Sequence, residues 1–507
     1  MRKLLEHQVR RCGLNKLIVL SNRAPFVFKG ENMHITKAAR AVSGLVSALE
    51  PITGACGGTW VGWGGRVAGE SRVGGRVAVP LDRPEYTVRE MVFSRQEYQR
   101  YYHGFANDCL WPLFHCFLEK AVFDHDYWQS YVRVNCKFAE AAAAEADGDA
   151  LIWVHDYHLT LVPGMLRDMG YRGQIAFFCH IPFPPLEIFS ALPWGEDILR
   201  GLLGSDLVAF HLNGYVENFL RVVEKQLQAG IDHGRGRIDR GERTVRVRAL
   251  PIGIDYREFE AAARREEIRR RAAEIRRRVG VDRLVLSVER LDYTKGIIEK
   301  LQGIEEFFSS CPQHRNRVAF LQVAVPSRTE VQTYADLRSS AEEMVSRING
   351  LYASNWSTPV KYMFKAFNRD ELVAHYCAAD VCLVTSLRDG LNLVAKEYVA
   401  SRVAGDGVLV LSTFAGAAEQ LSGCLPVNPY DRVDLAEKIN KAVEMAPAEQ
   451  KLRMATLQQS VRHYDLNWWW QGVLAGLARN TGSPAGAGKG EGPLAAGEFV
   501  PKRRPDG

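Results

Sequence analysis

The 507-residue sequence predicts an α/β protein made of two Rossmann-like, doubly wound lobes that face a shared cleft. Three observations lead to this fold class. Short apolar runs alternate with helical patterns along most of the chain, which is typical of parallel sheets covered by helices on both faces. The hydrophobic content of 47% supplies core material for two or three domains. The segment 251–255, Pro-Ile-Gly-Ile-Asp, has the punctuation of an interdomain connection.

The individual elements follow from these apolar runs and from the helical spacing between them. We expect strands at residues 17–21, 151–155, 175–180, 207–210, 284–289, 318–325, 381–385 and 408–412. We expect helices over residues 199–203, 215–228 and 297–308. These elements form two sets, one before and one after the connection.

The domain organisation follows from this division. We predict an N-terminal lobe at 1–250 and a C-terminal lobe at 251–455. A final helix, roughly residues 448–478, carries three consecutive tryptophans, and its part from 456 to 480 is expected to pack across the lobes. Residues 481–507 are rich in Gly, Pro and Lys with little to bury, so we predict a disordered tail.

Composition argues against several classes of protein. No apolar run approaches the ~20 residues of a membrane span, and the run after the basic start is too short for a signal-peptide core. The ten cysteines are scattered without a Cys-x-x-Cys pair, which favours reduced thiols and a cytoplasmic location. The net charge of +6 is mild, and glutamates interrupt the arginine-rich segment 264–278. That segment is typical of a solvated amphipathic helix, so we do not expect nucleic-acid binding.

The segment from Thr385 to Glu397 is the most informative about function. It runs from an apolar strand through the turn Asp389-Gly390 into a helix for which Asn392 is a suitable cap. A helix that begins at the carboxyl end of a parallel strand presents N–H groups and a positive dipole that suit a phosphate or diphosphate. The carboxylates of Asp389 and Glu397 are spaced to reach different hydroxyls of a sugar attached to that diphosphate. An ordinary strand-loop-helix unit with a charged loop shows the same pattern, so this segment alone leaves both interpretations open.

Cations follow three other predicted strands. Arg23 comes after the first strand, Arg290 and Lys295 follow the strand at 284–289, and Arg328 follows the strand at 318–325. A single arginine in a loop is usually a surface residue. These strands belong to both predicted lobes, and because their carboxyl ends are expected to meet at the cleft, cations after three of them indicate a site for an anionic ligand.

Polar and aromatic groups complete the candidate site. The strand at 151–155 leads into Asp156, and the strand at 175–180 ends at His180 before a rigid proline loop. A zinc site formed by His155, His158 and His180 is an alternative, but the segment lacks a nearby thiolate or a His-Glu-x-x-His signature. The aromatic-rich segment 98–112 suits either a buried helix or a wall against which a sugar ring stacks.

Seven motifs, in order from about Leu17 to Trp470, together resemble the motif series of trehalose-6-phosphate synthases. Each motif alone is weak, but the ordered series is specific. The motifs are Ser21-Asn-Arg23, Trp60-Val-Gly-Trp63, Leu110-Trp-Pro112, His155-Asp-Tyr-His-Leu159, His180-Ile-Pro-Phe-Pro184, Ser287-Val-Glu-Arg-Leu-Asp-Tyr-Thr-Lys-Gly296 and Leu387-Arg-Asp-Gly-Leu-Asn-Leu-Val-Ala-Lys-Glu-Tyr398.

The resemblance implies a retaining glycosyltransferase of the two-lobed GT-B type, which moves glucose from a nucleotide diphosphate glucose to glucose 6-phosphate without a metal or cofactor. UDP-glucose is the donor that we expect. The acceptor-binding residues implied are Arg23, Tyr102, Trp111, Asp156 and Arg328. The donor-binding residues implied are Ser43, Gly44, Arg290, Lys295, Phe367, Asp389, Gly390, Asn392, Leu393, Val394 and Glu397. The residues implied in catalysis are Arg290, Lys295, His180, Asp389 and Glu397.

One position departs from the family pattern. The family usually has two glycines where this chain has Ser43-Gly44, and the Cβ of the serine alters how closely the backbone approaches the donor. Trp111 and His180 resemble the residues that shape the sugar pocket and favour the α,α linkage.

Two alternatives to this function stay open in the sequence. One is a sister enzyme that uses another donor nucleotide or another phosphorylated acceptor, such as glycerol 3-phosphate. The other is a nonenzymatic sensor of sugar phosphates, against which the intact Arg290, Lys295, Asp389 and Glu397 argue. The chain lacks an Asp-x-Asp-Gly-Thr phosphatase motif, so we expect a separate phosphatase to act on the product. A homo-oligomer is possible.

Overall fold

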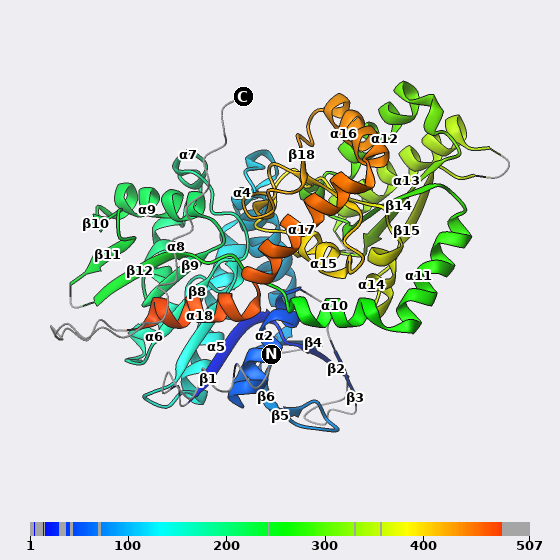
Figure 1. Ribbon diagram of the computed structural model, residues 1–507. Coiled ribbons are helices and arrows are strands. Elements are labelled where there is room, and N and C mark those ends of the chain that lie inside the picture. The colour runs from blue at the N-terminus through cyan, green and yellow to red at the C-terminus, as the bar shows by residue number, and fades with distance from the viewer. Residues whose placement is uncertain are drawn as a thin grey trace, which may run out of the picture. The chain divides into compact units, whose positions relative to one another are not determined.

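The computed structural model describes residues 5, 14, 16–29, 37–40, 44–68, 72–241, 243–328, 331–354 and 357–478. Two compact units make up the chain: residues 1–251 together with 467–507, and residues 252–466. Each unit is built on one large sheet (Figure 1). Within the described ranges, no helix is both long and apolar enough to cross a membrane. The predicted tail at 481–507 lies outside the described residues.

The sheet of the first unit has ten strands in the order β10-β11-β12-β9-β8-β7-β1-β4-β6-β5. The strands from β12 to β6 in this order run parallel, and the two edges are antiparallel. The bounds are β1 Leu17–Arg23, β4 Thr59–Ala68, β5 Arg72–Val79, β6 Tyr86–Ser94, β7 Leu151–His155, β8 Ile175–Phe178, β9 Leu207–Phe210, β10 Ile231–Asp232, β11 Arg237–Arg240 and β12 Arg243–Ala249. A separate hairpin pairs β2 Phe26–Lys29 with β3 Lys37–Arg40.

Helices of the first unit follow its strands along the chain. Their bounds are α2 Gly44–Cys56, α3 Arg95–Glu97, α4 Trp111–Phe114, α5 His125–Glu145, α6 Val162–Asp168, α7 Leu186–Phe189, α8 Gly195–Leu202, α9 Asn213–Leu227 and α18 Leu466–Leu477. A π-helix covers Tyr98–Leu110, and short 3-10 turns cover Leu118–Lys120 and Tyr157–Leu159. Segment 98–112 is therefore helical. Whether it also forms a wall for a sugar ring depends on which of its aromatic rings are exposed at the edge of the sheet.

The second unit has a six-stranded, wholly parallel sheet in the order β15-β14-β13-β16-β17-β18. Its strands are β13 Arg283–Arg290, β14 Val318–Val325, β15 Val360–Phe364, β16 Val381–Val384, β17 Val408–Ser412 and β18 Leu425–Val427. Its helices are α10 Tyr256–Arg264, α11 Glu266–Val279, α12 Ile297–Ser310, α13 Gln332–Tyr352, α14 Arg369–Ala378, α15 Leu393–Ser401, α16 Arg432–Glu444 and α17 Pro447–His463, with 3-10 turns at Tyr293–Lys295, Pro312–His314 and Gly416–Glu419.

Helices cover both faces of this second sheet. The helices α12, α13 and α16 lie together on one face, and α11, α14 and α15 lie together on the other (Figure 1). The chain crosses from one face to the other where the strand order reverses, between β13 and β16. Ligands of doubly wound sheets bind at this switch point, beyond the carboxyl ends of the strands. The predicted doubly wound α/β class is confirmed for both units.

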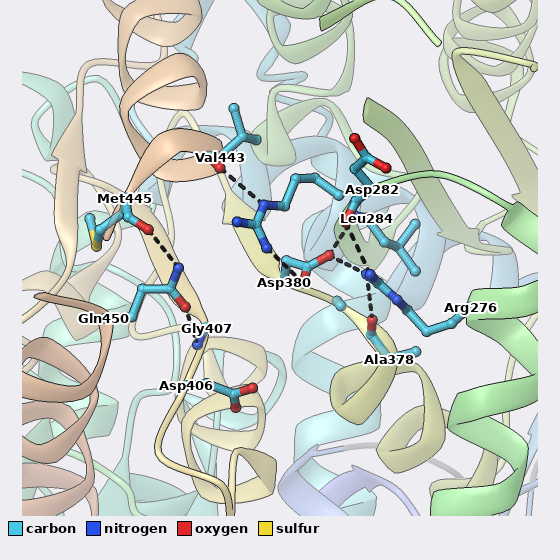
Figure 2. Close-up of polar contacts among 12 residues, drawn as sticks. Arg276, Asp282, Leu284, Ala378, Asp380, Asp406, Gly407, Val443, Met445 and Gln450 are labelled. Atoms are coloured by element: carbon cyan, nitrogen blue, oxygen red, sulfur yellow. Dashed lines mark hydrogen bonds and ion pairs between the residues drawn. The ribbon is translucent and has the colours of Figure 1, made fainter. Parts of the chain in front are cut away.

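A charged cluster fixes the opposite, amino-terminal ends of β13 and β16. The Asp380 carboxylate accepts hydrogen bonds from the Leu284 backbone N–H, at 2.7 Å, and from the Arg276 guanidinium (Figure 2). Arg283 Nη1 lies 3.7 Å from the same carboxylate, and its Nε donates to the Val443 carbonyl. The cluster therefore sets the register of the two strands whose far ends carry the loops with Arg290 and Asp389.

Several predicted element bounds differ from those of the structure, and two of these differences have a clear physical cause. The single final helix is in fact two helices, because the chain leaves α17 at Tyr464 and the Leu466 N–H donates to the Ile254 carbonyl at 3.1 Å. No proline or glycine marks this break. Strand β8 ends at Phe178, two residues early, because the His180 N–H bonds to an Asp156 Oδ1 instead of continuing the ladder.

The chain segments beside this break pack closely, and they lead to a stability prediction. A Cβ on Gly253 would lie 2.1 Å from the Asp465 carbonyl carbon and 2.6 Å from the Leu466 nitrogen. Neighbouring Ile252 is anchored by Lys396, whose Nζ donates to its carbonyl at 2.9 Å. Because backbone atoms cannot yield as side chains do, we expect Gly253→Ala to lower the apparent melting temperature by about 2–10 °C.

The matched control is Gly350→Ala, on the exposed face of α13, where an added Cβ meets nothing within 4 Å. Alanine in a helix interior is favoured over glycine, so this variant should melt at the same temperature or slightly higher. Thermal melts followed by circular dichroism compare the two. Equal melting temperatures for both variants would contradict the close packing at Gly253.

Candidate active site

Three loops meet at the carboxyl edge of the second unit's sheet. They follow β13, β14 and β16, which are neighbours or next neighbours in the sheet. The loop after β13 carries Arg290 and Lys295, the loop after β14 carries Arg328, and the loop after β16 carries Asp389. The structure thus brings together Asp389 with three of the cations that the sequence placed at strand ends, whereas the fourth, Arg23, belongs to the first unit.

Lys295 and Asp389 form the closest charged contact between these loops. Lys295 Nζ lies 2.6 Å from Asp389 Oδ2, and both side chains are largely buried. The same carboxylate oxygen accepts hydrogen bonds from Ser386 Oγ at 3.1 Å and from Asn392 Nδ2 at 3.0 Å. The Leu387 N–H donates to the Thr294 carbonyl at 2.8 Å, which joins the two loops through their backbones. These contacts hold the lysine ammonium at the mouth of the helix that begins after Asn392.

Glycine is required at two points of this loop arrangement. Gly296 has a φ of +64°, and a Cβ there would lie 2.6 Å from the Thr385 carbonyl oxygen. A Cβ on Gly416 would lie 2.2 Å from the Gly390 carbonyl oxygen, where the chain after β17 passes beneath the Asp389 turn. The backbones therefore approach too closely at these two points to leave room for a side chain.

Helix α15 begins as the sequence predicts. Asn392 is its cap, and its side-chain oxygen accepts a hydrogen bond from the Ala395 N–H at 3.2 Å. Leu393 and Val394 form the first turn and are partly exposed, so their N–H groups lie at a positive, accessible helix end. This is the geometry that binds phosphate groups at helix N-termini.

The carboxyl of Glu397 lies one turn further into α15. It accepts a hydrogen bond from the Tyr376 hydroxyl at 2.8 Å, and its burial raises the pKa of this carboxyl above the ordinary value. Phe367 is nearly fully buried, its ring lies 4.3 Å from that of His375, and Lys365 Nζ lies 4.4 Å from its centroid. Tyr376, which the sequence reasoning missed, fixes the orientation of the Glu397 carboxyl group.

Arg290 and Arg328 share a residue that the sequence reasoning also missed. Asp292 is fully buried, and its Oδ2 lies 3.6 Å from Arg290 Nη2 and 3.4 Å from Arg328 Nη1. Burial alone would raise the pKa of Asp292, but Arg290, Arg328 and Lys295 lower it to about 2. The carboxylate is therefore ionised at neutral pH. The only sign of it in the sequence is its position between two cations of one loop.

The carboxyl edge of the first unit's sheet carries the remaining predicted residues. Arg23 ends β1, its guanidinium carbon lies 5.2 Å and 5.5 Å from the ring centroids of Trp63 and Tyr102, and it is exposed. Tyr102 stacks on His158 at 5.9 Å. The π-helix therefore places a partly exposed ring beside the arginine, while Tyr101 is buried and donates to Asn22 Oδ1. The helical interpretation of segment 98–112 is confirmed, and a wall for a sugar ring, formed by Tyr102, stays a prediction.

Asp156 and His180 lie together at the ends of β7 and β8. Asp156 has a φ of +74°, an uncommon conformation for a residue other than glycine, and its Oδ1 accepts from the His180 N–H at 3.2 Å. Backbone strain of this kind is typical of functional sites. His155 Nδ1 lies 3.0 Å from His180 Nε2, so one of these ring nitrogens donates a hydrogen bond and the other accepts it.

The other predicted residues are placed as follows. Trp111 begins α4, is buried and packs 5.7 Å from the Tyr157 ring. Gly44 is exposed at the first residue of α2. The unusual Ser43 lies outside the described residues.

The buried histidine pair leads to a pH prediction. Burial lowers the pKa of His155 and of His180 well below the ordinary value, and a neighbouring imidazole lowers each further, that of His180 for His155 and that of His211 for His180. The folded protein therefore keeps them neutral while the unfolded chain takes up protons as the pH falls below about 6.5, so stability is lost in that direction. Each histidine contributes up to about 1.4 kcal/mol per pH unit to this slope.

We expect His155→Phe to make the unfolding free energy less sensitive to pH between 7.5 and 5.5. The exposed His463, replaced by Gln, is the control and should leave the slope as it is. Urea unfolding followed by tryptophan fluorescence measures both, since Trp153 contacts His155 at a ring distance of 4.5 Å. Equal slopes for the wild type and His155→Phe would contradict the neutral buried state.

The chain is similar to known proteins over most of its length. The model of glycosyltransferase family 20 matches residues 15–479. The trehalose-6-phosphate synthase of Mycolicibacterium smegmatis is 39% identical over 474 residues, which cover 92% of this chain and 93% of that protein.

Two solved structures superpose closely. A UDP-forming α,α-trehalose-phosphate synthase from Burkholderia xenovorans in complex with glucose-6-phosphate is 34% identical, with a TM-score of 0.84 over 91% of this chain and 99% of that one. A trehalose-6-phosphate protein from E. coli bound with UDP-2-fluoro glucose is 35% identical, with a TM-score of 0.82 over 91% of this chain and 98% of that one.

Proposed function

This chain belongs to glycosyltransferase family 20, and on that premise we propose that it is a trehalose-6-phosphate synthase that transfers glucose, with retention, from UDP-glucose to glucose 6-phosphate. The observation that carries the proposal is the convergence of Arg290, Lys295 and Asp389 with the start of α15 at one sheet edge. Relatives of 34–39% identity that cover nearly the whole chain carry this activity in their names.

The second unit supplies the donor residues in this proposal. Arg290, Lys295 and the N–H groups of Leu393 and Val394 face the diphosphate, where two cations and a helix dipole neutralise its charge. Asp389 and the backbone around Gly390 bind hydroxyls of the donor glucose. The carboxyl of Glu397, oriented by Tyr376, binds the ribose hydroxyls, and Phe367 lies on the nucleoside side of this helix.

The first unit supplies most of the acceptor residues in this proposal, and Arg328 is the acceptor residue assigned from the second unit. Arg23, backed by the ring of Tyr102, and Arg328 are the cations for the phosphate of glucose 6-phosphate, because a guanidinium offers paired donors to phosphate oxygens. Asp156 accepts hydrogen bonds from acceptor hydroxyls. Trp111 and His180 shape the sugar pocket, and Gly44 contributes backbone to the donor side.

The chemistry follows from where charge develops. As the bond between the glucose anomeric carbon and the diphosphate oxygen breaks, negative charge grows on the leaving oxygen, and Arg290, Lys295 and the helix end stabilise it. The acceptor hydroxyl attacks the same face of the anomeric carbon, and its proton passes to the leaving phosphate oxygen. This route needs no separate protein base and keeps the configuration of the donor.

Substrate choice is tested by a transfer assay in which product mass is resolved. Pure protein is incubated with UDP-, GDP- or ADP-glucose, each with an equimolar mixture of glucose 6-phosphate and glycerol 3-phosphate. We expect a phosphorylated disaccharide from UDP-glucose as the main product. A product of glycerol 3-phosphate alone would contradict the proposed acceptor and indicate the sister activity, and ligand binding without transfer would indicate a sensor.

We infer further that the enzyme works in the cytoplasm and that a separate phosphatase removes the phosphate from its product. The nine cysteines among the described residues are all free thiols, which fits a reducing compartment. Both substrates in this proposal are phosphorylated metabolites. Export of the enzyme in an oxidised form would contradict this placement.

A further inference from the structure

Asp292 occupies an unusual position in the second unit. It is fully buried in the loop after β13, and four charged or polar side chains from two different loops and a helix converge on it. Oδ2 faces Arg290 Nη2 at 3.6 Å, Arg328 Nη1 at 3.4 Å and the Tyr334 hydroxyl, which donates to it at 3.4 Å. Oδ1 accepts from the Thr294 N–H at 3.1 Å and from Thr294 Oγ1 at 2.9 Å.

The two oxygens of this carboxylate have different partners and therefore different tasks. Among the described residues, Oδ1 bonds within its own loop, at Thr294, and shapes the turn that leads to Lys295. Oδ2 faces outward to the two arginines. The side chain of Arg328 is almost fully buried, whereas that of Arg290 is 41% exposed, so the shared carboxylate holds one arginine inside and the other at the surface of the site.

Tyr334 strengthens the contact with Arg328. Its hydroxyl accepts a hydrogen bond from Arg328 Nη1 and donates one to Asp292, and its ring lies 5.2 Å from the guanidinium carbon. The backbone of Arg328 has a φ of +48°, in the left-handed region that residues other than glycine seldom adopt. A strained backbone and a doubly bound guanidinium together fix the direction in which this arginine points.

We propose that Asp292 is a positioning residue that aligns the donor-binding Arg290 with the acceptor-binding Arg328, so that one carboxylate sets the geometry of both phosphate contacts. This inference rests on the proposed function, which assigns the two arginines to the two substrates. Asp292 does not touch either substrate. It acts by holding guanidinium groups that would otherwise repel each other and Lys295.

This role has a consequence that a purely structural one lacks. Asp292 is negative, and it competes with substrate phosphates for the same cations. Its removal therefore raises the positive charge of the site, which favours the binding of anions, while it loosens their alignment, which slows the transfer step. Removal of the Asp292 charge should therefore slow the transfer step without weakening the binding of the substrate phosphates.

The test compares three variants with the wild type. Asp292→Asn keeps the size of the side chain and an oxygen for Thr294 but removes the charge. We expect its kcat to fall at least tenfold while the Kd for UDP, measured by calorimetry, stays within threefold of the wild type. Asp434→Asn is the control, because it removes the charge of an ion-paired carboxylate on α16, away from the three loops, so its kcat should stay within threefold.

Tyr334→Phe tests the same inference without disturbing the buried charge. The hydroxyl that is lost hydrogen-bonds to Arg328 and Asp292 among the described residues. Its loss therefore loosens Arg328, so the KM for glucose 6-phosphate should rise several-fold while the KM for UDP-glucose stays unchanged. This variant also decides the matter if Asp292→Asn does not fold.

Three results would overturn the inference. They are an unchanged kcat in Asp292→Asn, a loss of UDP affinity in parallel with kcat, and equal changes of both KM values in Tyr334→Phe. The wild type, assayed beside them, separates this inference from the proposed function. A wild type that forms no disaccharide phosphate contradicts the proposed function, and the role of Asp292 falls with it, whereas an active wild type with an equally active Asp292→Asn contradicts only the role of Asp292.

Discussion

Lys295→Ala is expected to lower the turnover number at saturating donor by tens-fold or more. The Lys295 ammonium lies 2.6 Å from Asp389 and beside the start of α15, and only a tenth of its side chain is exposed. A charge held this way stabilises the leaving diphosphate more in the transition state than in the bound substrate. Loss of a buried charge contact costs roughly 2–5 kcal/mol, which corresponds to this fall in rate.

The control for this variant is Lys438→Ala. Lys438 is also ion-paired, to Asp434 at 3.0 Å, but it lies on α16, away from the three loops. Its turnover should equal that of the wild type. Initial rates of UDP release at saturating UDP-glucose and glucose 6-phosphate measure both variants. Near-normal turnover of Lys295→Ala under these conditions would refute its role at the leaving group.

Arg328→Ala is expected to have the second large effect, confined to the acceptor. Its guanidinium is held by Asp292 and Tyr334, so it is prepared to bind a phosphate with little loss of side-chain freedom. We expect kcat/KM for glucose 6-phosphate to fall about a hundredfold, since truncation of a hydrogen-bonded charge contact costs roughly 2–5 kcal/mol. The Kd for UDP should change by less than threefold.

The matched control is Arg338→Ala, an arginine of α13 whose partner is the exposed Glu342. This substitution should leave kcat/KM for both substrates unchanged. Steady-state kinetics with each substrate varied in turn, together with calorimetry of UDP, separate the two effects. Equal losses for donor and acceptor in Arg328→Ala would count against the acceptor assignment.

The parallel core of both sheets could be predicted from the apolar runs of the sequence. Strands β7, β9, β14 and β17 begin and end at the predicted residues. Buried parallel strands are apolar on both faces, so they stand out as continuous runs. The cap of α15 at Asn392 could also be predicted, because the amide precedes the helix directly.

The sheet edges and the break in the final helix could not be predicted in this way. In β4 and β5, glycines and arginines interrupt the apolar residues, because these strands lie near or at an edge and one face meets solvent. The break between α17 and α18 comes from a tertiary hydrogen bond, Leu466 to Ile254, between residues far apart in the chain. The helix propensities of the residues around Tyr464 therefore do not predict the break.

The site residues divide along the same line. The cations and carboxylates at strand ends could be predicted, because the topology of a parallel sheet brings such ends together. Asp292, Tyr334 and Tyr376 could not, because each acts through a partner from another loop or helix. A carboxylate two residues after an arginine is the only local sign of Asp292, and it is equally typical of a surface ion pair.

The central claim is that this chain joins two glucose units through an α,α linkage with UDP as the leaving group. The most direct measurement incubates the wild type with UDP-glucose labelled with ¹³C at the anomeric carbon and with glucose 6-phosphate, and follows the reaction by NMR. We expect one new α-anomeric signal, equimolar release of UDP, and nonreducing trehalose after phosphatase treatment. A β-anomeric product, or UDP released with free glucose alone, would contradict it.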